Sequence, residues 1–342
     1  MPALTKNRVS ADIRGTPPPA SYEYRYKCRN SKEEEMTATA RTSTAANQQM
    51  WEYEQPLPHG IVVAVDDSPE SVEAFKMASE VARIRGWRLH VVSAISPFPS
   101  RGLLPTLDED KAAVDVMRLD IRNAAITDMI AEVGKGTDCT QEVVIGRPAR
   151  SIASAAESRG ADLIVTGRKL HNPMERLIGG ETSLQVMRVT SIPVLAVPTW
   201  SNGLKSVVVA TDFSESSVKA ARVAAELMGG KGTIHLVYVD EPQDIIAGIP
   251  MRYEGRSPTD IVAWFRRTSA LLTESCGLKV EPTVLTGKPA QAVLDFAERV
   301  GAGMIAAGSH GYSRIEKFLL GSVSTALVRH AACPVMVARA PD

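Results

Sequence analysis

The 342-residue sequence has few cysteines, few aromatic residues and no excess of charge of either sign. Its four cysteines are scattered, without a CxxC pair, so the sequence predicts neither a disulfide framework nor a zinc site. Basic and acidic residues number 39 each, which argues against a nucleic-acid-binding surface. Apolar runs such as IVVAV and PVLAVP are far too short to cross a bilayer, and the N-terminal region lacks the apolar core of a secretory signal. These absences favour a cytoplasmic protein with neither nucleic-acid nor membrane partners.

Residues 1–58 differ from the rest of the chain. They are polar, mixed in charge and without apolar periodicity, which predicts a disordered N-terminal extension. Met36 lies inside this segment, and we expect the true start of the protein there. A functional tail is the competing interpretation.

From His59 onward the chain contains two copies of one unit. The segments GIVVAVDDSPES and KSVVVATDFSES open the copies, and four further pairs of segments follow in the same order, ending with SIPVLAVP and ACPVMVAR. Such ordered self-similarity indicates a duplication. We therefore expect one domain over residues 59–198 and a second over residues 205–340, joined by the turn-rich linker TWSNGLK.

The apolar segments are short, rich in Val and Ile and free of polar alternation, which is typical of buried parallel strands. Between them lie helical segments, two of which follow the capping residues Ser68 and Ser214. Strands that alternate with helices imply parallel βαβ crossovers. The sequence thus predicts an α/β fold of two tandem Rossmann-like, doubly wound domains, each a five-stranded parallel sheet flanked by helices. Further helices are expected over 109–133, 149–159, 182–189, 259–275, 290–300 and 323–330.

Residues suited to ligand binding follow two strands of the second half. In an open α/β sheet, ligands bind beyond the carboxyl ends of the strands. Asp212 follows the first strand, where a carboxylate can accept hydrogen bonds from an adenine amino group or a ribose hydroxyl; helix capping is the alternative. The fourth strand ends at Gly308, and Gly311 and Gly321-Ser322 follow it. Glycines permit close backbone approach and a helix N-terminus favours anions, so this segment predicts a phosphate-binding loop.

The spacing of these glycines and the serine, G-x2-G-x9-G-(S/T), resembles the glycine motif of the universal stress protein family. The segments GSHG, LLGSVS and ACPVMV are also similar to family sequence, and the resemblance covers about residues 59–340 in the tandem form of the family. It implies a fold that holds ATP, with Mg2+ on the phosphates. The residues that it implies for nucleotide binding are Ala210, Asp212, Val237, Val239, Gly308, His310, Gly311, Gly321, Ser322, Val323 and Ser324.

The first half departs from this motif. Asp66, Gly167 and Gly180 match the second half, but Leu170 places a branched side chain where the loop should approach phosphate. Glu181 places a carboxylate where a serine should donate a hydrogen bond. A carboxylate about 4 Å from a phosphate charge costs on the order of 1–4 kcal/mol at a surface-like dielectric. We therefore expect that this half does not bind ATP in the family manner.

Two other roles are open for the first half. It can bind nucleotide weakly through a rearranged loop, with Arg168 among the residues that offset Glu181. It can also serve as a structural partner, because pairing of strand edges between the two domains would cover exposed edges.

The sequence favours a regulator over an enzyme. It contains no Walker A lysine motif and no legible arrangement of acid, histidine and nucleophile. His90 and His235 occupy equivalent strand positions, where packed or edge residues are expected rather than metal ligands. We expect an ATP-dependent stress-response regulator acting through an unidentified protein partner. The alternatives are a slow ATP hydrolase or nucleotidyl transferase, and an interaction module without nucleotide; a tandem chain permits but does not require a homodimer.

Overall fold

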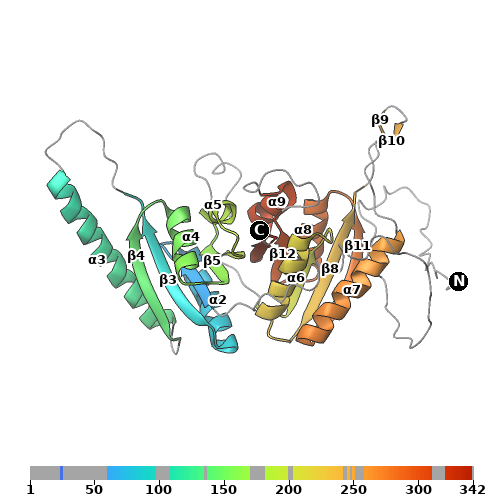
Figure 1. Ribbon diagram of the computed structural model, residues 1–342, viewed down its shortest axis with the longest axis horizontal. Helices are drawn as coiled ribbons and strands as arrows, with labels where there is room; N and C mark the ends of the chain where they lie inside the picture. The colour runs from blue at the N-terminus through green and yellow to red at the C-terminus, as the bar shows by residue number, and fades with distance from the viewer. Residues whose placement is uncertain are drawn as a thin grey trace.

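The computed structural model describes residues 24–25, 60–97, 108–134, 137–169, 182–198, 203–241, 245–246, 249–250, 258–309 and 320–340. Within these ranges strands and helices alternate along the chain, and most strands belong to one large sheet (Figure 1). This alternation confirms the predicted α/β class. The predicted N-terminal extension, residues 1–58, lies outside the described residues apart from β1 (Tyr24–Arg25), which pairs antiparallel with β11 (Lys279–Thr286).

The first half of the chain builds one parallel part of the sheet, in the strand order β4-β3-β2-β5-β6. The chain moves outward from β2 to β4 and then returns to the other side of β2. Its elements are β2 (Gly60–Ala64), α2 (Pro69–Arg85), β3 (Arg88–Ile95), α3 (Asp108–Val133), β4 (Cys139–Ile145), α4 (Pro148–Ser158), β5 (Leu163–Gly167), α5 (Thr182–Val189) and β6 (Val194–Val197).

The second half repeats this arrangement in the order β11-β8-β7-β12-β13, again with parallel neighbours. The two orders confirm the predicted pair of doubly wound, five-stranded parallel sheets. Its remaining elements are β7 (Ser206–Ala210), α6 (Glu215–Leu227), β8 (Thr233–Asp240), the short antiparallel pair β9 (Ile245–Ile246) and β10 (Ile249–Pro250), α7 (Pro258–Cys276), α8 (Pro289–Arg299), β12 (Met304–Gly308), α9 (Ser322–His330) and β13 (Val335–Ala338).

Helices α2 and α6 begin at the serine caps that the sequence predicts. Ser68 Oγ accepts a hydrogen bond from the N–H of Ser71, and Ser214 Oγ accepts one from the N–H of Ser217. Gly86 ends α2 at a φ of 68°, a left-handed conformation that glycine adopts without steric cost. The further helices begin and end within one residue of the expected bounds.

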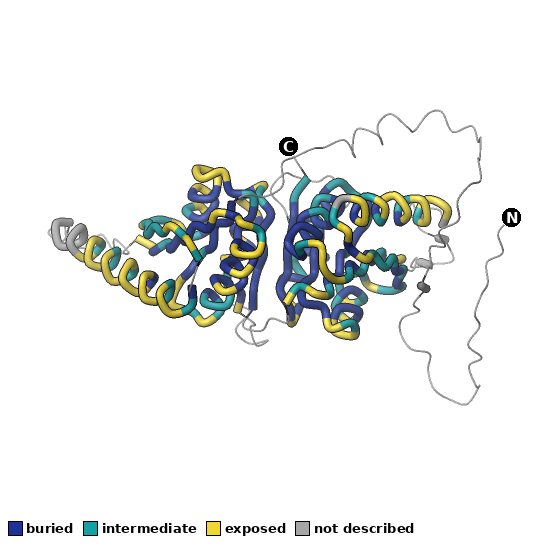
Figure 2. The backbone as a smooth tube through the Cα atoms, turned by 90° about the horizontal axis from the view of Figure 1, so that it is seen from below, coloured by how far each residue is buried: buried dark blue, intermediate teal, exposed yellow. Residues whose placement is uncertain are grey.

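Helices cover both faces of the sheet. One buried apolar cluster joins the strands to α2, α3, α6 and α7, and a second joins them to α4, α5, α8 and α9. Figure 2 shows the buried strands between helices whose outer sides are exposed. Neighbouring strand residues therefore face different clusters, as Leu236 and Val237 do on β8. Burial on both faces explains why the strands lack polar alternation.

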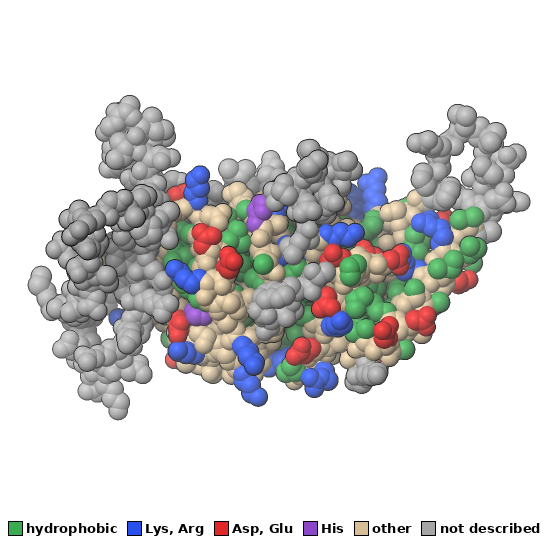
Figure 3. Space-filling view, turned by 180° about the vertical axis from the view of Figure 1, so that it is seen from behind, with side chains coloured by type: hydrophobic (Ala, Val, Ile, Leu, Met, Phe, Trp, Pro, Cys, Tyr) green, Lys and Arg blue, Asp and Glu red, His purple; other side chains and the backbone are tan. Residues whose placement is uncertain are grey.

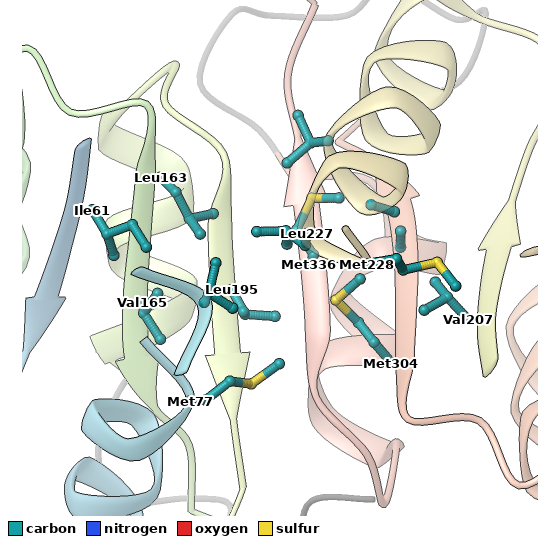
Figure 4. Packing of buried hydrophobic residues seen from close by; sticks show 14 of the residues in the cluster. Ile61, Met77, Leu163, Val165, Leu195, Val207, Leu227, Met228, Met304 and Met336 are labelled. Carbon is teal, nitrogen blue, oxygen red and sulfur yellow. The ribbon is translucent and has the colours of Figure 1, made fainter. Parts of the chain in front are cut away.

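The two halves meet where their last strands pair. β6 and β13 are antiparallel neighbours, with Leu195 opposite Met336 and Val194 opposite Val337. Leu195 and Met336 are fully buried, and Figure 4 shows them at the junction, one from each half. The pairing makes one continuous 11-stranded sheet. The expected pairing of strand edges between the two domains is thus confirmed.

A charged contact also spans the junction, on the α2–α6 face of the sheet. Arg85, the last residue of α2, forms an ion pair with Glu226 near the end of α6. Glu226 is only 5% exposed, so its carboxylate depends on this partner. Loss of one member of such a pair leaves a buried charge without compensation, which is strongly destabilising.

His90 on β3 and His235 on β8 hold equivalent positions, and each contacts side chains of the neighbouring strand. His90 Nδ1 lies 2.7 Å from Oγ1 of Thr140, and its Nε2 lies 3.2 Å from Oε1 of Glu142. His235 Nδ1 lies 3.3 Å from Oε2 of Glu281. Burial lowers the pKa of His90 and outweighs the hydrogen bond with Glu142, which raises it. His90 is therefore a packed core residue, as the sequence predicts.

The free energy of unfolding is expected to fall as the pH drops below about 6.5, the ordinary pKa of histidine. Because the folded-state pKa of His90 is lowered, the unfolded chain binds more protons in this range. Burial raises the pKa of Glu142, but hydrogen bonds from His90 and Arg159 outweigh it and hold that pKa low, so this carboxylate adds a loss only in stronger acid. Urea unfolding between about pH 7.5 and 5.5 measures how steeply the free energy of unfolding falls with pH, and this dependence should be weaker in His90→Gln than in wild type. The exposed His330→Gln is the control and should keep the wild-type pH dependence. An equal pH dependence in wild type and His90→Gln would contradict the assignment of this loss to His90.

The outer side of α3 carries exposed apolar side chains. Val116, Met117 and Ile121 are each more than half exposed, and Val114 is 40% exposed. Figure 3 shows hydrophobic atoms gathered along this helix. Among the described side chains of the equivalent helix α7, only Val262 is a large exposed hydrophobic residue. The equivalent helices α3 and α7 therefore differ in the number of large apolar side chains that they expose.

Candidate functional site

The candidate site lies at the carboxyl edge of the second half, where the strand order reverses. β8 lies on one side of β7 and β12 on the other, and Ala210 at the end of β7 pairs with Ala307 of β12. The fold thereby brings Asp212, which follows β7, and Gly308, which ends β12, to the same edge. In doubly wound sheets this switch point is where ligands bind.

Asp212 is half-buried and organises the start of α6. Its Oδ1 accepts hydrogen bonds from the N–H of Ser214 at 3.0 Å and from Ser214 Oγ at 2.6 Å. Ser214, and not Asp212, is the N-cap, so the capping alternative holds only indirectly. Both bonds end on Oδ1, which leaves Oδ2 without a hydrogen bond to any residue that the structure describes. Oδ2 can therefore accept a bond from a ligand.

Gly308 is required by packing between strand and helix. A Cβ atom at this position would lie 2.7 Å from the backbone N of Ser217 and 2.9 Å from the carbonyl carbon of Ser216. In the first half, a Cβ on Gly167 would lie 2.7 Å from the N of Ser71. Only glycine lets the first turn of α6 or α2 approach the strand this closely, which explains why both copies keep it.

The N-terminus of α9 faces the same edge of the sheet. Gly321 is the N-cap, and its N–H donates to the carbonyl oxygen of Ser309 at 2.7 Å. No side chain among the described residues caps this helix, in contrast to α2 and α6. Ser322 is exposed and Val323 is half-buried, so the first turn is at least partly open to solvent. Such a turn is suited to an anion.

Ser324 ties α9 to β12. It is 4% exposed, and its hydroxyl donates to the carbonyl oxygen of Gly308 at 2.5 Å. Ser183 makes the same bond to Gly167 in the first half, at 3.0 Å. Because both halves share this bond, it positions the helix whatever the loop binds. The proton of Ser324 is engaged there, which leaves Ser322 as the exposed hydroxyl of the first turn.

The residues predicted to face the base differ in exposure. Val237 is 1% exposed, and its carbonyl oxygen accepts a hydrogen bond from the N–H of Thr211 at 2.8 Å. Val239 and Ala210 are only partly buried and belong to the α8–α9 side of the sheet. A ligand at this edge would therefore meet Val239 and Ala210 before Val237.

Phe213 was not singled out from the sequence, yet it shapes this edge. It is fully buried, adopts a φ of 63°, and its ring stacks on Tyr238 and Trp264 at centroid distances of 5.5 and 5.9 Å. The equivalent residue in the first half is Asp67, which forms a bidentate pair with Arg122 at 2.6 and 2.7 Å. The sequence signal for this difference was the replacement of Asp67, in the segment DDS of the first half, by Phe213 in the segment DFS of the second half. One edge is lined by an aromatic cluster and the other by an ion pair.

The first-half site is described only in part. Asp66 is exposed after β2, and its Oδ1 accepts a hydrogen bond from the N–H of Ser68 at 2.9 Å, as Asp212 does for Ser214. Gly167 ends β5. The remaining predicted residues of both loops lie outside the described residues; they are Leu170, Gly180, Glu181, His310 and Gly311.

Arg168 of the first half contacts the second half of the chain. It is 2% exposed, and its Nη2 donates to the carbonyl oxygens of Ala331 at 2.7 Å and Cys333 at 3.1 Å, both in the second half. These bonds place the guanidinium at the junction with the second half. Glu181 lies outside the described residues, so the expectation that Arg168 offsets it stays a prediction.

The described residues contain no group of three or more His, Cys, Asp or Glu side chains that could hold a metal ion. They also contain no helix long and apolar enough to span a membrane. Cys333 is 5% exposed, and burial raises the pKa of its thiol to about 11.

The strand orders and the β6–β13 junction define a class of protein: a tandem pair of doubly wound α/β domains fused into one sheet. The sequence profile of the universal stress protein family matches this chain twice, over residues 59–198 and 203–339. The chain belongs to the universal stress protein family, in its tandem form.

Individual relatives agree with this assignment. A universal stress protein of Mycolicibacterium smegmatis is 25% identical over 291 residues, which is 82% of this chain and 97% of that protein. One from Methanocaldococcus jannaschii is 28% identical over 145 residues, 41% of this chain and 85% of that protein. The crystal structure of a universal stress protein from Archaeoglobus fulgidus superposes with a TM-score of 0.63 at 19% identity, covering 83% of this chain and 99% of that one. The structural likeness supports the fold alone.

Proposed function

We propose that the second half of this chain binds ATP, with the phosphates at the N-terminus of α9 and the nucleoside toward Asp212. The observation that carries the proposal is the first turn of α9. It lies at the switch point, it has no side-chain cap among the described residues, and Ser322 is exposed beside its N–H groups. Unpaired N–H groups and the helix dipole favour a polyphosphate there.

The nucleoside end is proposed on different chemistry. Asp212 Oδ2 can accept a hydrogen bond from a ribose hydroxyl or an adenine amino group, while the two bonds from Ser214 to Oδ1 fix the orientation of the carboxylate. Val239 and Ala210 supply apolar surface beside it. A carboxylate would repel phosphate, so the polarity of the site orients the nucleotide with its phosphates toward α9.

Mg2+ is proposed to be held through the phosphates of ATP. The described part of the chain offers oxygen donors rather than a cluster of acidic ligands at this edge. Ser322 carries the exposed hydroxyl of the first turn of α9. Mg2+ prefers oxygen ligands, so this hydroxyl would be the protein group best suited to contact the ion. When bound, the ion would neutralise phosphate charge and hold the triphosphate in one conformation.

We further propose that ATP occupancy, rather than turnover, is the signal, and that the protein acts as a stress-response regulator in the cytoplasm. Membership of the universal stress protein family supports this role. The sequence has neither a Walker A lysine motif nor a legible acid–histidine–nucleophile arrangement. The first half is proposed as a structural partner without ATP bound in the family manner, in line with the commitment of Arg168 to the other half.

Mg-ATP is expected to raise the melting temperature of the purified full chain. At 100 times its dissociation constant, a ligand adds about 2.7 kcal/mol to the free energy of unfolding. Protein should first be denatured and any released nucleotide identified by mass, and melting then measured with ATP, with ADP and with inorganic triphosphate. A calorimetric titration should give one ATP per chain.

The same experiment separates the alternatives. Absence of both copurified nucleotide and a melting shift would exclude ATP as the ligand and leave the interaction module. Steady release of inorganic phosphate from bound ATP would favour the slow hydrolase. Two ATP molecules per chain would show that the first half binds nucleotide after all.

A further inference from the structure

Arg168 of the first half holds one end of a helix in the second half. The residue directly follows Gly167 at the end of β5, and it is almost wholly buried at the junction. Its Nη2 donates to the carbonyl oxygens of Ala331 and Cys333 at 2.7 and 3.1 Å. Ala331 is the C-cap of α9. A buried cation thus bonds directly to the carbonyl end of this helix.

The same helix carries the proposed phosphate site at its other end. α9 has nine residues, so about 13 Å separate its two ends. A cation at the C-terminus offsets the negative end of the helix dipole and thereby leaves the positive end less opposed. The two bonds also fix where α9 ends, while Ser324 fixes it near its start. Arg168 therefore bears on both the electrostatics and the placement of the first turn.

We propose that Arg168 is a positioning residue of the first half that tunes phosphate binding by the second half. The proposal rests on the proposed function, because it assigns a regulator to that site. It gives the first half a direct part in nucleotide binding: this domain contributes a cation to the far end of the helix that binds the phosphates.

The chain also contains a reciprocal contact that provides a control. Arg339, which follows β13, donates from Nη2 to the carbonyl oxygen of Arg188 in the last turn of α5, at 3.1 Å. Each half thus places an arginine on the C-terminal end of the other half's last helix. Only the contact of Arg168 reaches the helix with the proposed phosphate site. Loss of Arg339 removes an arginine contact across the same junction without touching α9.

The sequence position of Arg168 shows how the halves have diverged. Arg168 and Ser309 are equivalent, and the N–H of each donates to the last strand at 2.7 Å, to Val197 and Ala338 respectively. In the second half, the carbonyl of Ser309 accepts the N–H of Gly321 and so closes the start of α9. In the first half, the side chain at this position serves the other domain.

The test compares Arg168→Met with Arg339→Met by calorimetric titration of Mg-ATP and of adenosine. Arg168→Met is expected to weaken ATP binding about three- to tenfold and to leave adenosine binding unchanged, because only the phosphates depend on α9. Arg339→Met should change neither. Arg168→Lys keeps a cation and a donor and should recover part of the ATP affinity, which also covers the case in which Arg168→Met does not fold.

Hydrogen exchange at the amides of Gly321 and Thr325, at the phosphate end of α9, gives a readout independent of ligand. Faster exchange in Arg168→Met than in Arg339→Met supports the positioning role. Unchanged ATP affinity in folded Arg168→Met overturns the proposal, as does an equal loss of ATP and adenosine binding. If wild-type protein binds no ATP, the proposed function fails, and the exchange rates alone then decide whether Arg168 positions α9.

Discussion

Ser322→Glu is expected to weaken Mg-ATP binding from about fivefold to several hundredfold. The substitution places a carboxylate beside the N–H groups proposed to bind phosphate, and two like charges about 4 Å apart cost on the order of 1–4 kcal/mol at a surface-like dielectric. Ser322 is exposed and lies in the first helical turn, where an acidic residue is well tolerated, so folding should not suffer. Calorimetric titration with Mg-ATP measures the loss.

Two variants make this result interpretable. Ser322→Ala removes the hydroxyl but keeps the backbone N–H and should weaken ATP binding less than threefold, about 0.6 kcal/mol. Ala124→Glu introduces the same charge at an exposed position of α3 in the first half and should leave binding unchanged. ATP bound by Ser322→Glu with wild-type affinity would show that the phosphates lie elsewhere.

Gly308→Ala is expected to lower the free energy of unfolding by about 2–3 kcal/mol, in the range measured for overpacked sites. The added Cβ would lie 2.7 Å from the backbone N of Ser217, so strand and helix must separate. Gly167→Ala should cost a similar amount in the first half, where the Cβ would lie 2.7 Å from the N of Ser71. Guanidinium denaturation measures both losses.

Gly60→Ala is the matched control for these glycines. Gly60 also lies in a strand, but its added Cβ would have nothing closer than 3.6 Å, an ordinary van der Waals contact. Its free energy of unfolding should not fall and is expected to rise by about 0.4–1 kcal/mol. Equal stabilities of Gly308→Ala and Gly60→Ala would contradict the packing explanation and return Gly308 to a purely ligand-based role.

The fold could be predicted because its signals are local and occur twice. Short Val- and Ile-rich runs mark the strands, Ser68 and Ser214 mark two helix starts, and the repeated order gives both domains. The buried charges at the junction could not be predicted in the same way. Arg168 lies 163 residues before Ala331, and its partners are backbone carbonyls, which every residue possesses. No side-chain pattern identifies such a contact.

For some residues of the candidate site, the structure shows a role that differs from the one the sequence suggests. The sequence attributes Gly308 to close approach of a ligand, whereas the structure shows contact with the first turn of α6. Retention of Gly167 in the copy that departs from the motif was already a sign of such a structural requirement. Ser324 is similar, since its partner in the first half, Ser183, makes the same bond. Gly308 and Ser324 thus serve the fold, and Asp212 and Ser322 remain the proposals for binding.

The antiparallel pairing of β6 and β13 has a consequence for stoichiometry. Because both strands belong to one chain, their association is intramolecular, and its effective concentration is set by the short linker between the halves rather than by the amount of protein in the cell. The continuous sheet therefore survives dilution, and the two unlike halves are always present in equal number. Each half stays paired with the other half because the two are covalently linked. The site of one half can therefore differ from that of the other, and a residue such as Arg168 can contact the second half instead of its own.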